Sequence, residues 1–254
     1  MERPRGQTAR AAGSGSMLEI PQNKRSTRIF LVIALSMLSC LFLVLVRYGL
    51  TGRFSQGYLL WNLLLAAVPL VVAGYGARFA SGTSRKQRSR AVGLAVFTVW
   101  LVFYPNAPYL FTDFIHVVRR SGLGAVALPW LSQADLQWYD IVMNAAFAFV
   151  GHYIGLVSMY LMHGTMKLLF GRVAGWAFLA PAILLSGFGI HIGRFSRFDS
   201  WDLVLHPVET LRVIAQSLTD PAAVLFSLAF AFFIALTYII FYIVKRDPLG
   251  YLDA

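Results

Sequence analysis

Long apolar runs separated by short polar segments dominate this sequence. Runs of about 20 apolar residues match the length that a helix needs to cross about 30 Å of hydrocarbon at 1.5 Å per residue. The pattern therefore predicts an all-α fold, a polytopic transmembrane helical bundle. The six expected spans are Ile29–Val46, Tyr58–Ala77, Ala91–Tyr104 with a broken continuation, Trp138–Met162, Val173–Gly193 and Ala222–Val244.

The third apolar run ends in the segment YPNAPYLFTDFIH, residues 104–116. Proline removes a backbone donor and disfavours helical geometry in the residue before it, so we expect the third span to be broken at Pro105–Pro108. Asn106 is suited to cap a new helix, whose positive end would favour an anionic lipid headgroup. A proline kink whose asparagine satisfies the freed backbone groups is the alternative.

A polar stripe follows this break. Tyr109, Asp113 and His116 recur at helical spacings of three and four, while most residues between them are apolar. Ionisable side chains at membrane depth are costly and usually functional. We therefore expect Asp113 and His116 to belong to a site, unless they simply meet water at the membrane surface.

Composition points to a membrane environment and away from nucleic acid. Hydrophobic residues make up 58% of the 254 residues and charged residues 13%, against about a quarter charged in a soluble domain. The net charge of +11 comes from basic residues between apolar runs, where they orient helices in a bilayer. Fifteen of the 22 Lys and Arg residues fall on the side that holds both termini, so both termini are predicted to be cytoplasmic in a multi-pass protein of the cell membrane.

Three regions are expected along the chain. Residues 1–28 are rich in Arg, Gly and Ser and predict a disordered basic cytoplasmic tail, in which Met17 is a possible alternative start. Residues 29–246 form a single transmembrane domain, and 247–254 a short cytoplasmic tail. Within the domain, Pro207–Leu218 predicts a short helix before the last span, lying along the membrane interface or as a solvated loop.

Two further polar clusters are expected on the same, non-cytoplasmic side, where Asp140 and Arg194 would join Asp113 and His116 in one pocket. Trp138, Tyr139 and Asp140 open the fourth span, and Asn144 and His152 follow on the face of Asp140. Trp138 and Tyr139 alone are ordinary interfacial anchors, and His152 is better explained as a neutral packing histidine than as a ligand or proton carrier.

The second cluster lies between Gly187 and Pro207. His191 and Arg194 share a helical face, and Arg197 follows one turn later. Asp199 to Asp202, with Trp201 between them, resembles a helix start in which a carboxylate caps the backbone. The two arginines either bind an anion or extend to lipid headgroups.

The ordered motifs PNAPYLFTDFIH, WYD and GRFSRFDSWDL resemble the bacterial membrane proteins of the domain-of-unknown-function family numbered 1361, over roughly Ile29 to Val244. The resemblance implies a polytopic bacterial membrane protein and no particular activity. His191 stands where the family more often has Tyr, and Asp199 where it often has Asn. These departures weaken schemes that need His191 as a metal ligand or Asp199 as a charge.

Three functions remain open from the sequence. The first is an enzyme acting on a lipid-linked or cell-envelope substrate, with general acid and base or a divalent metal at the carboxylates and phosphate or carboxylate held by arginine. The second is a transporter or lipid-binding carrier. The third is a scaffold or assembly factor in which charged pairs lock helices together. The candidate catalytic residues are Asp113, His116, Asp140, Arg194, Arg197 and Asp202; the candidate substrate-binding residues are Asn106, Tyr109, Trp138, Tyr139, Asn144 and Trp201.

The single cysteine limits the remaining chemistry. Cys40 lies within the first apolar run, so an intramolecular disulfide and a cysteine-based metal site are excluded. The expected surroundings are the lipid bilayer, with a lipid headgroup or anionic ligand at the outer face and no nucleic acid.

Overall fold

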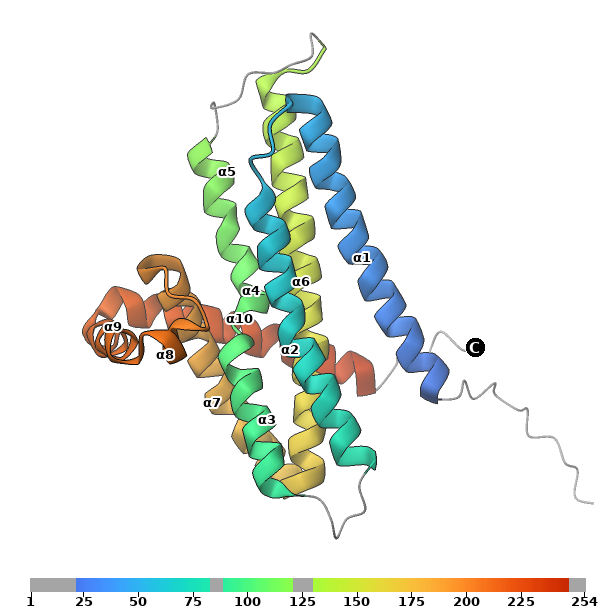
Figure 1. The fold of residues 1–254 in the computed structure, drawn as a ribbon, viewed down its shortest axis with the longest axis vertical. Helices are drawn as coiled ribbons and strands as arrows, with labels where there is room; N and C mark the ends of the chain where they lie inside the picture. The colour runs from blue at the N-terminus through green and yellow to red at the C-terminus, as the bar shows by residue number, and fades with distance from the viewer. Residues whose placement is uncertain (1–21, 83–88, 121–129, 247–254) are drawn as a thin grey trace, which may run out of the picture.

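The computed structural model describes residues 22–82, 89–120 and 130–246, and within these ranges the secondary structure is helical, without strands. Six segments are long and apolar enough to cross a membrane, and Figure 1 shows them as long helices gathered around α6. The predicted polytopic helical fold is therefore confirmed. The candidate spans are Thr27–Thr51, Gly57–Gly82, Arg90–Val117, Gln133–Phe170, Arg172–Ser196 and Pro221–Lys245.

The helices follow the apolar runs and extend beyond several of their predicted ends. The first helix begins at Gln22, so the last residues of the predicted tail 1–28 are helical. Met17 and the rest of that tail, and the predicted tail 247–254, lie outside the described residues. The elements are α1 Gln22–Thr51, α2 Gly57–Gly82, α3 Arg90–Phe103, α4 Asn106–Tyr109, the 3₁₀ turn η1 Leu110–Asp113, α5 Phe114–Arg120, α6 Gln133–Phe170, α7 Arg172–His191, the π-helical turn η2 Ile192–Ser196, α8 Asp202–Leu205, α9 Pro207–Thr219 and α10 Pro221–Arg246.

The central helix α6 starts before the predicted position at Trp138. Ser132 and Asp135 form a capping box that satisfies backbone donors at its N-terminus. Its 38 residues correspond to about 57 Å at 1.5 Å per residue. Because this exceeds the hydrocarbon thickness of about 30 Å, α6 must tilt or extend beyond the membrane.

Small residues on α6 allow the third span to pack closely against this helix. A Cβ atom at Gly151 would collide with the Leu110 side chain, and one at Gly155 would lie 2.9 Å from the Ala107 Cβ atom. Ala107 and Leu110 are both buried. The two glycines therefore allow the residues that follow Pro105 to pack directly against the central helix α6.

The third span changes its hydrogen bonding at the proline but keeps its direction. α3 ends at Phe103, and Tyr104 and Pro105 retain helical torsions, with φ/ψ of −57°/−38° and −55°/−26°. In Figure 1, α3, α4 and α5 form one column. The interruption is thus a short stretch of tighter helical turn. It is not the start of an independent helix whose first backbone N–H groups are unbonded.

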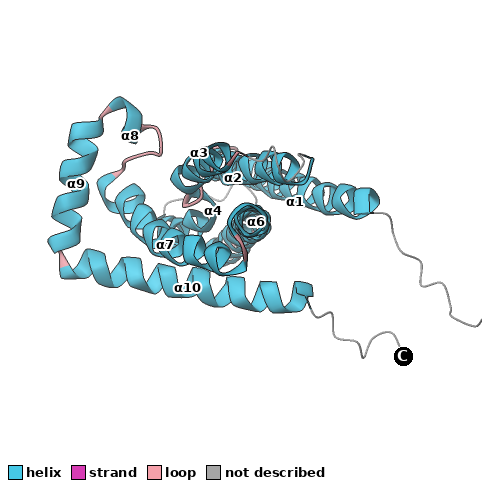
Figure 2. Ribbon diagram, turned by 90° about the horizontal axis from the view of Figure 1, so that it is seen from below, coloured by secondary structure: helices cyan, strands magenta, loops and turns pink. Residues whose placement is uncertain are grey.

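The last span packs along α7 and crosses the other helices. A Cβ atom at Gly187 would collide with the Ser227 carbonyl oxygen, so the α7 and α10 backbones lie in direct contact. Figure 2, in which α6 is seen end-on, shows α10 extended across the view. In both Figure 1 and Figure 2, α8 and α9 lie on the side opposite the start of α1 and the end of α10.

The helix predicted at Pro207–Leu218 is α9. Its apolar residues Val208, Leu211 and Leu218 are each at least 59% exposed, while Thr210 and Ser217 are buried against the protein. An exposed apolar face beside the spans is typical of a helix that lies at a membrane interface.

Candidate functional site

Asp113 is the centre of a buried polar cluster formed by three spans. Its side chain is 2% exposed. The Asn62 amide on α2 donates a 2.8 Å hydrogen bond to Asp113 Oδ2, and Arg194 Nη1 lies 3.4 Å from Asp113 Oδ1. Each carboxylate oxygen therefore has a partner from a different span, as a buried charge requires.

His116 completes this cluster, which we call the Asp113 cluster (Asn62, Asp113, His116 and Arg194). His116 Nε2 lies 3.3 Å from both terminal nitrogens of Arg194 and 3.9 Å from Asp113 Oδ1. A guanidinium group can only donate, so this geometry needs a lone pair on Nε2 and a proton on Nδ1. His116 is thus a neutral acceptor for Arg194 rather than a cation beside Asp113.

The π-helical turn η2 brings Arg194 to the cluster. Such turns insert an extra residue into a helix and occur often at functional sites. The turn covers Ile192–Ser196 and ends at Arg197, whose φ of 57° places it in the left-handed region and stops the helix. Arg194 consequently points toward Asp113, while the Arg197 residue is exposed. The two arginines predicted to act together are separated.

Asp140 forms a second polar cluster with Arg47, which is not among the predicted site residues. Arg47, at the end of the first span, contacts both Asp140 oxygens, at 2.5 and 2.9 Å, and also the Ser55 hydroxyl group. The expected grouping of Asp140 with Asp113 and Arg194 is therefore wrong in its partners: Asp140 links α6 to α1. A lone arginine at the end of an apolar helix was the available signal, but it was counted only for orientation.

The other candidates on α6 surround this second pair. The Tyr139 hydroxyl group donates to the Leu43 carbonyl group, and the Asn144 amide donates to the Asp140 carbonyl group. Trp138 is 67% exposed. Tyr139 thus links α6 to α1, the buried Asn144 bonds within α6, and Trp138 faces the surroundings, so their geometry gives no support to a role in substrate binding.

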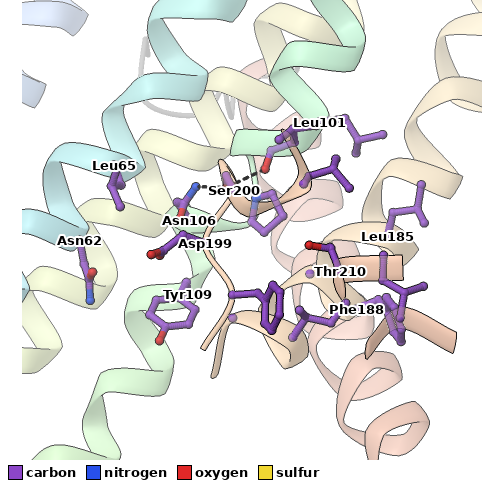
Figure 3. Close-up of a pocket in the computed structure, with 18 residues that line it drawn as sticks. Asn62, Leu65, Leu101, Asn106, Tyr109, Leu185, Phe188, Asp199, Ser200 and Thr210 are labelled. Carbon is purple, nitrogen blue, oxygen red and sulfur yellow. Dashed lines mark hydrogen bonds between the residues drawn. The ribbon is translucent and has the colours of Figure 1, made fainter. Parts of the chain in front are cut away.

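A pocket of about 260 Å³ adjoins the Asp113 cluster. Asn62 belongs to both, and Figure 3 shows Asn62, Asn106, Tyr109 and Asp199 on one side of the pocket. Asn106 and Tyr109 are the lining residues that were predicted to bind a substrate. Asp199 was predicted only as part of a helix start and discounted as a charge, and the polar lining residues Asn62, Ser200 and Thr210 were not predicted.

The Asn106 side chain forms hydrogen bonds across the interruption of the third span instead of capping a helix. Its side-chain amide donates to the Phe103 carbonyl group at 2.9 Å and to the Ser200 hydroxyl group at 3.0 Å, and α4 has no side-chain cap. Ser200 in turn donates to the Val102 carbonyl group. The predicted cap at Asn106 is wrong, because Pro105 occupies the cap position and helical torsions continue through it. The anion site predicted there depended on that cap. The alternative, an asparagine that satisfies freed backbone groups, describes the contacts.

The loop that carries Asp199 is held by Asp202. The Asp202 carboxylate accepts a 2.7 Å hydrogen bond from the Asp199 backbone N–H, which precedes α8; α8 itself has no side-chain cap, so the predicted carboxylate cap is wrong. Trp201 packs edge-on against Trp61 at 6.5 Å between ring centroids. Neither Trp201 nor Asp202 lines the pocket, and both position the loop.

Asp199 is the only acidic or basic side chain among the described residues that line the pocket. Partial loss of water raises the pKa of its carboxyl group, and the negative charge of Asp202 adds to this shift. Among the described residues, no donor contacts the Asp199 carboxylate and no partner contacts the Tyr109 hydroxyl group. These groups are available to a ligand.

The described residues do not assemble a metal centre. No group of three or more His, Cys, Asp or Glu side chains with suitable geometry occurs among them. Asp113 and His116 lie close together, but Arg194 already neutralises that carboxylate. The positive guanidinium group would oppose a divalent cation at this position.

The sequence profile of a protein family of unknown function, DUF1361, matches residues 61–237. This chain belongs to that family. The DUF1361 match includes the Asp113 cluster, the second pair's Asp140 and every residue that lines the pocket, but not Arg47. No curated protein and no solved structure matches the chain.

Replacing Asn62 by leucine, which has a similar volume, should destabilise the protein. The change removes the donor to a buried carboxylate oxygen and costs about 1–3 kcal/mol in the free energy of unfolding. Unfolding of the full chain in detergent micelles measures this. Leu64→Ala is the control, because Leu64 lies on the same helix and is 58% exposed. Equal effects of the two changes would contradict the assigned role of Asn62.

Proposed function

We propose that this integral membrane protein binds the hydroxyl-bearing headgroup of a lipid or lipid-linked molecule in the pocket beside the Asp113 cluster. The observation that supports this proposal is the unpaired Asp199 carboxylate on the same side of that pocket as Tyr109 and Asn62. Hydroxyl groups donate to carboxylates and accept from amide and phenol groups. This donor and acceptor set suits a sugar or another polyol.

The other lining residues support a ligand with an apolar part. Leu101, Leu185, Leu203, Phe188 and Ile214 line the same pocket. An apolar pocket with a few polar groups that fix orientation is the usual form of a small-molecule site. A polar head joined to a hydrocarbon chain matches this combination.

The pocket's charge favours a neutral or hydroxyl-bearing head over the anionic one expected from the sequence. Arg194 is committed to Asp113 and His116, and Arg197 does not line the pocket. Asp199 would repel a phosphate or carboxylate. The earlier expectation that two arginines hold an anion therefore lacks support from the contacts.

The Asp113 cluster acts as a support rather than as the reacting group in this proposal. Both Asp113 oxygens have partners and the side chain is 2% exposed, so it cannot accept a proton from a ligand without breaking those contacts. Its hydrogen bond to Asn62 fixes one wall of the pocket. Binding, as in a carrier, is accordingly better supported than acid–base catalysis by Asp113 and Asp140.

Asp199→Asn should weaken binding of a glucosyl diacylglycerol about tenfold, because a hydrogen bond to a charged group is replaced by one to a neutral amide. Titration of the full chain in phosphatidylcholine nanodiscs measures the affinity. Glu209→Gln serves as the control, since Glu209 is an exposed acid outside the pocket.

The pH dependence gives a second readout of the same titration. Affinity should fall as the pH is lowered through the pKa of Asp199, which lies above the ordinary aspartate value of about 3.9, and Asp199→Asn should abolish this dependence. Unchanged affinity in the variant, or tighter binding at low pH, would refute the proposed role.

The pocket is proposed to face the non-cytoplasmic side of the cell membrane, with both termini in the cytoplasm. The support is the excess of Lys and Arg in the segments on the side of the termini. α8 and α9, which border the pocket, belong to the connection between the fifth and sixth candidate spans, which the Lys and Arg count assigns to the side away from the termini.

Single cysteines on a Cys40→Ala background test this orientation. Phe54→Cys, between α1 and α2, should react with a membrane-impermeant maleimide in intact cells. Val173→Cys, 83% exposed at the start of α7, should react only after permeabilisation. The reverse labelling pattern would place the pocket on the cytoplasmic side.

A further inference from the structure

A second pocket of about 520 Å³ lies where η2, the end of α9 and the start of α10 meet. Its lining shares no residue with the pocket proposed for the hydroxyl-bearing head. Its lining residues are His191, Phe195, Ser196, Gln216, Ser217, Asp220, Ala222 and Phe226. The two pockets thus occupy different sides of the same π-helical turn.

His191 leaves an unsatisfied polar atom at this pocket. The residue is 8% exposed, and its Nδ1 atom has no hydrogen-bond partner among the described residues. A neutral imidazole ring has one nitrogen that donates and one that accepts. Because leaving a buried polar group without a partner is unfavourable, the ring requires a group that the described residues do not supply.

Asp220 provides the pocket's charge. One of its oxygens accepts a 3.0 Å hydrogen bond from the Ala222 backbone N–H, which caps α10, and the other has no donor among the described residues. No Lys or Arg is among the described lining residues. The pocket therefore presents a negative charge to a ligand.

Aromatic rings surround the same space. His191 stacks on Phe195 at 4.8 Å between ring centroids, and Phe226 meets Phe195 edge-on at 5.1 Å. Ring faces attract cations, and recognition of ammonium groups is a frequent use of this attraction. A carboxylate beside aromatic rings is thus a suitable environment for an organic cation.

We infer that the pocket formed by His191, Phe195, Asp220 and Phe226 binds a primary ammonium group, which donates hydrogen bonds to Asp220 and to the accepting nitrogen of His191. A quaternary ammonium has no N–H donor and would leave both acceptors unsatisfied. The ammonium group belongs either to the headgroup of an aminophospholipid or to a small soluble amine. The junction of α9 and α10 lies at the end of a candidate span, where lipid headgroups would be found.

Native mass spectrometry of the full chain in detergent tests the inference with dihexanoyl phosphatidylethanolamine as the probe. Dihexanoyl phosphatidylcholine is the matched comparison, since its headgroup lacks N–H donors. The expected result is adducts with the first lipid at about tenfold lower concentration than with the second. Equal binding of the two lipids, or no adduct with the first, would overturn the inference even without any variant.

Two variants locate the binding. Asp220→Asn removes the charge but keeps an oxygen that can cap α10, and His191→Phe keeps the ring and removes both nitrogens. Each should reduce phosphatidylethanolamine adducts about tenfold, whereas Glu209→Gln and the first pocket's Asp199→Asn should not. Adducts that persist in both variants would overturn the assignment, and their loss in Asp199→Asn alone would assign the amine to the first pocket instead.

Free ethanolamine distinguishes the two sources of the ammonium group. Displacement of phosphatidylethanolamine by equimolar ethanolamine would indicate that the amine alone suffices and that a soluble amine is the ligand. Retention of the lipid under those conditions would indicate an aminophospholipid. Both results require the Asp220 and His191 dependence described above.

Discussion

A carboxylate buried within membrane-spanning helices must be neutralised by donors from the protein, and Asp113 imposes this requirement on the structure. Two other spans meet it, with Asn62 on α2 and Arg194 after α7. Leaving a buried charge without its partner costs several kcal/mol. The requirement therefore fixes how the second, third and fifth spans approach one another and where the pocket beside them forms.

The π-helical turn at Ile192–Ser196 contributes residues to three different environments. Arg194 contacts Asp113, Gly193 lines the first pocket, and Phe195 lines the second. A regular helix would rotate these side chains to other directions. One irregular turn thus connects the supporting cluster to both candidate binding sites, which explains why polar residues concentrate at this end of α7.

The sequence was sufficient for the helices and for part of the site. Apolar run length identified all six candidate spans, because hydrocarbon thickness sets helix length. Helical spacing also placed Asp113 and His116 on one face, as the Asp113 cluster confirms. Local rules could not show which distant residue pairs with which: the partner of Asp140 is Arg47, near the end of α1, whose charge indicated only the orientation of the span.

The misassigned residues have physical explanations. Proline rules suggested that Asn106 caps a new helix; α4 does begin at Asn106, but Pro105 occupies the cap position and the Asn106 amide bonds Phe103 and Ser200 instead. Asn62 and Thr210 appeared as isolated polar residues in the sequence and became pocket residues only through tertiary contact. Spacing of Arg194 and Arg197 suggested a joint role, which the left-handed backbone at Arg197 prevents.

A double-mutant cycle between Asp113 and Arg194 tests the central claim most directly. Asp113→Asn and Arg194→Gln would be introduced singly and together, and the free energy of unfolding measured for the full chain in detergent micelles. The account predicts a coupling energy above about 1 kcal/mol, because the two groups neutralise each other in a buried site. Effects that add to within about 0.5 kcal/mol would contradict it.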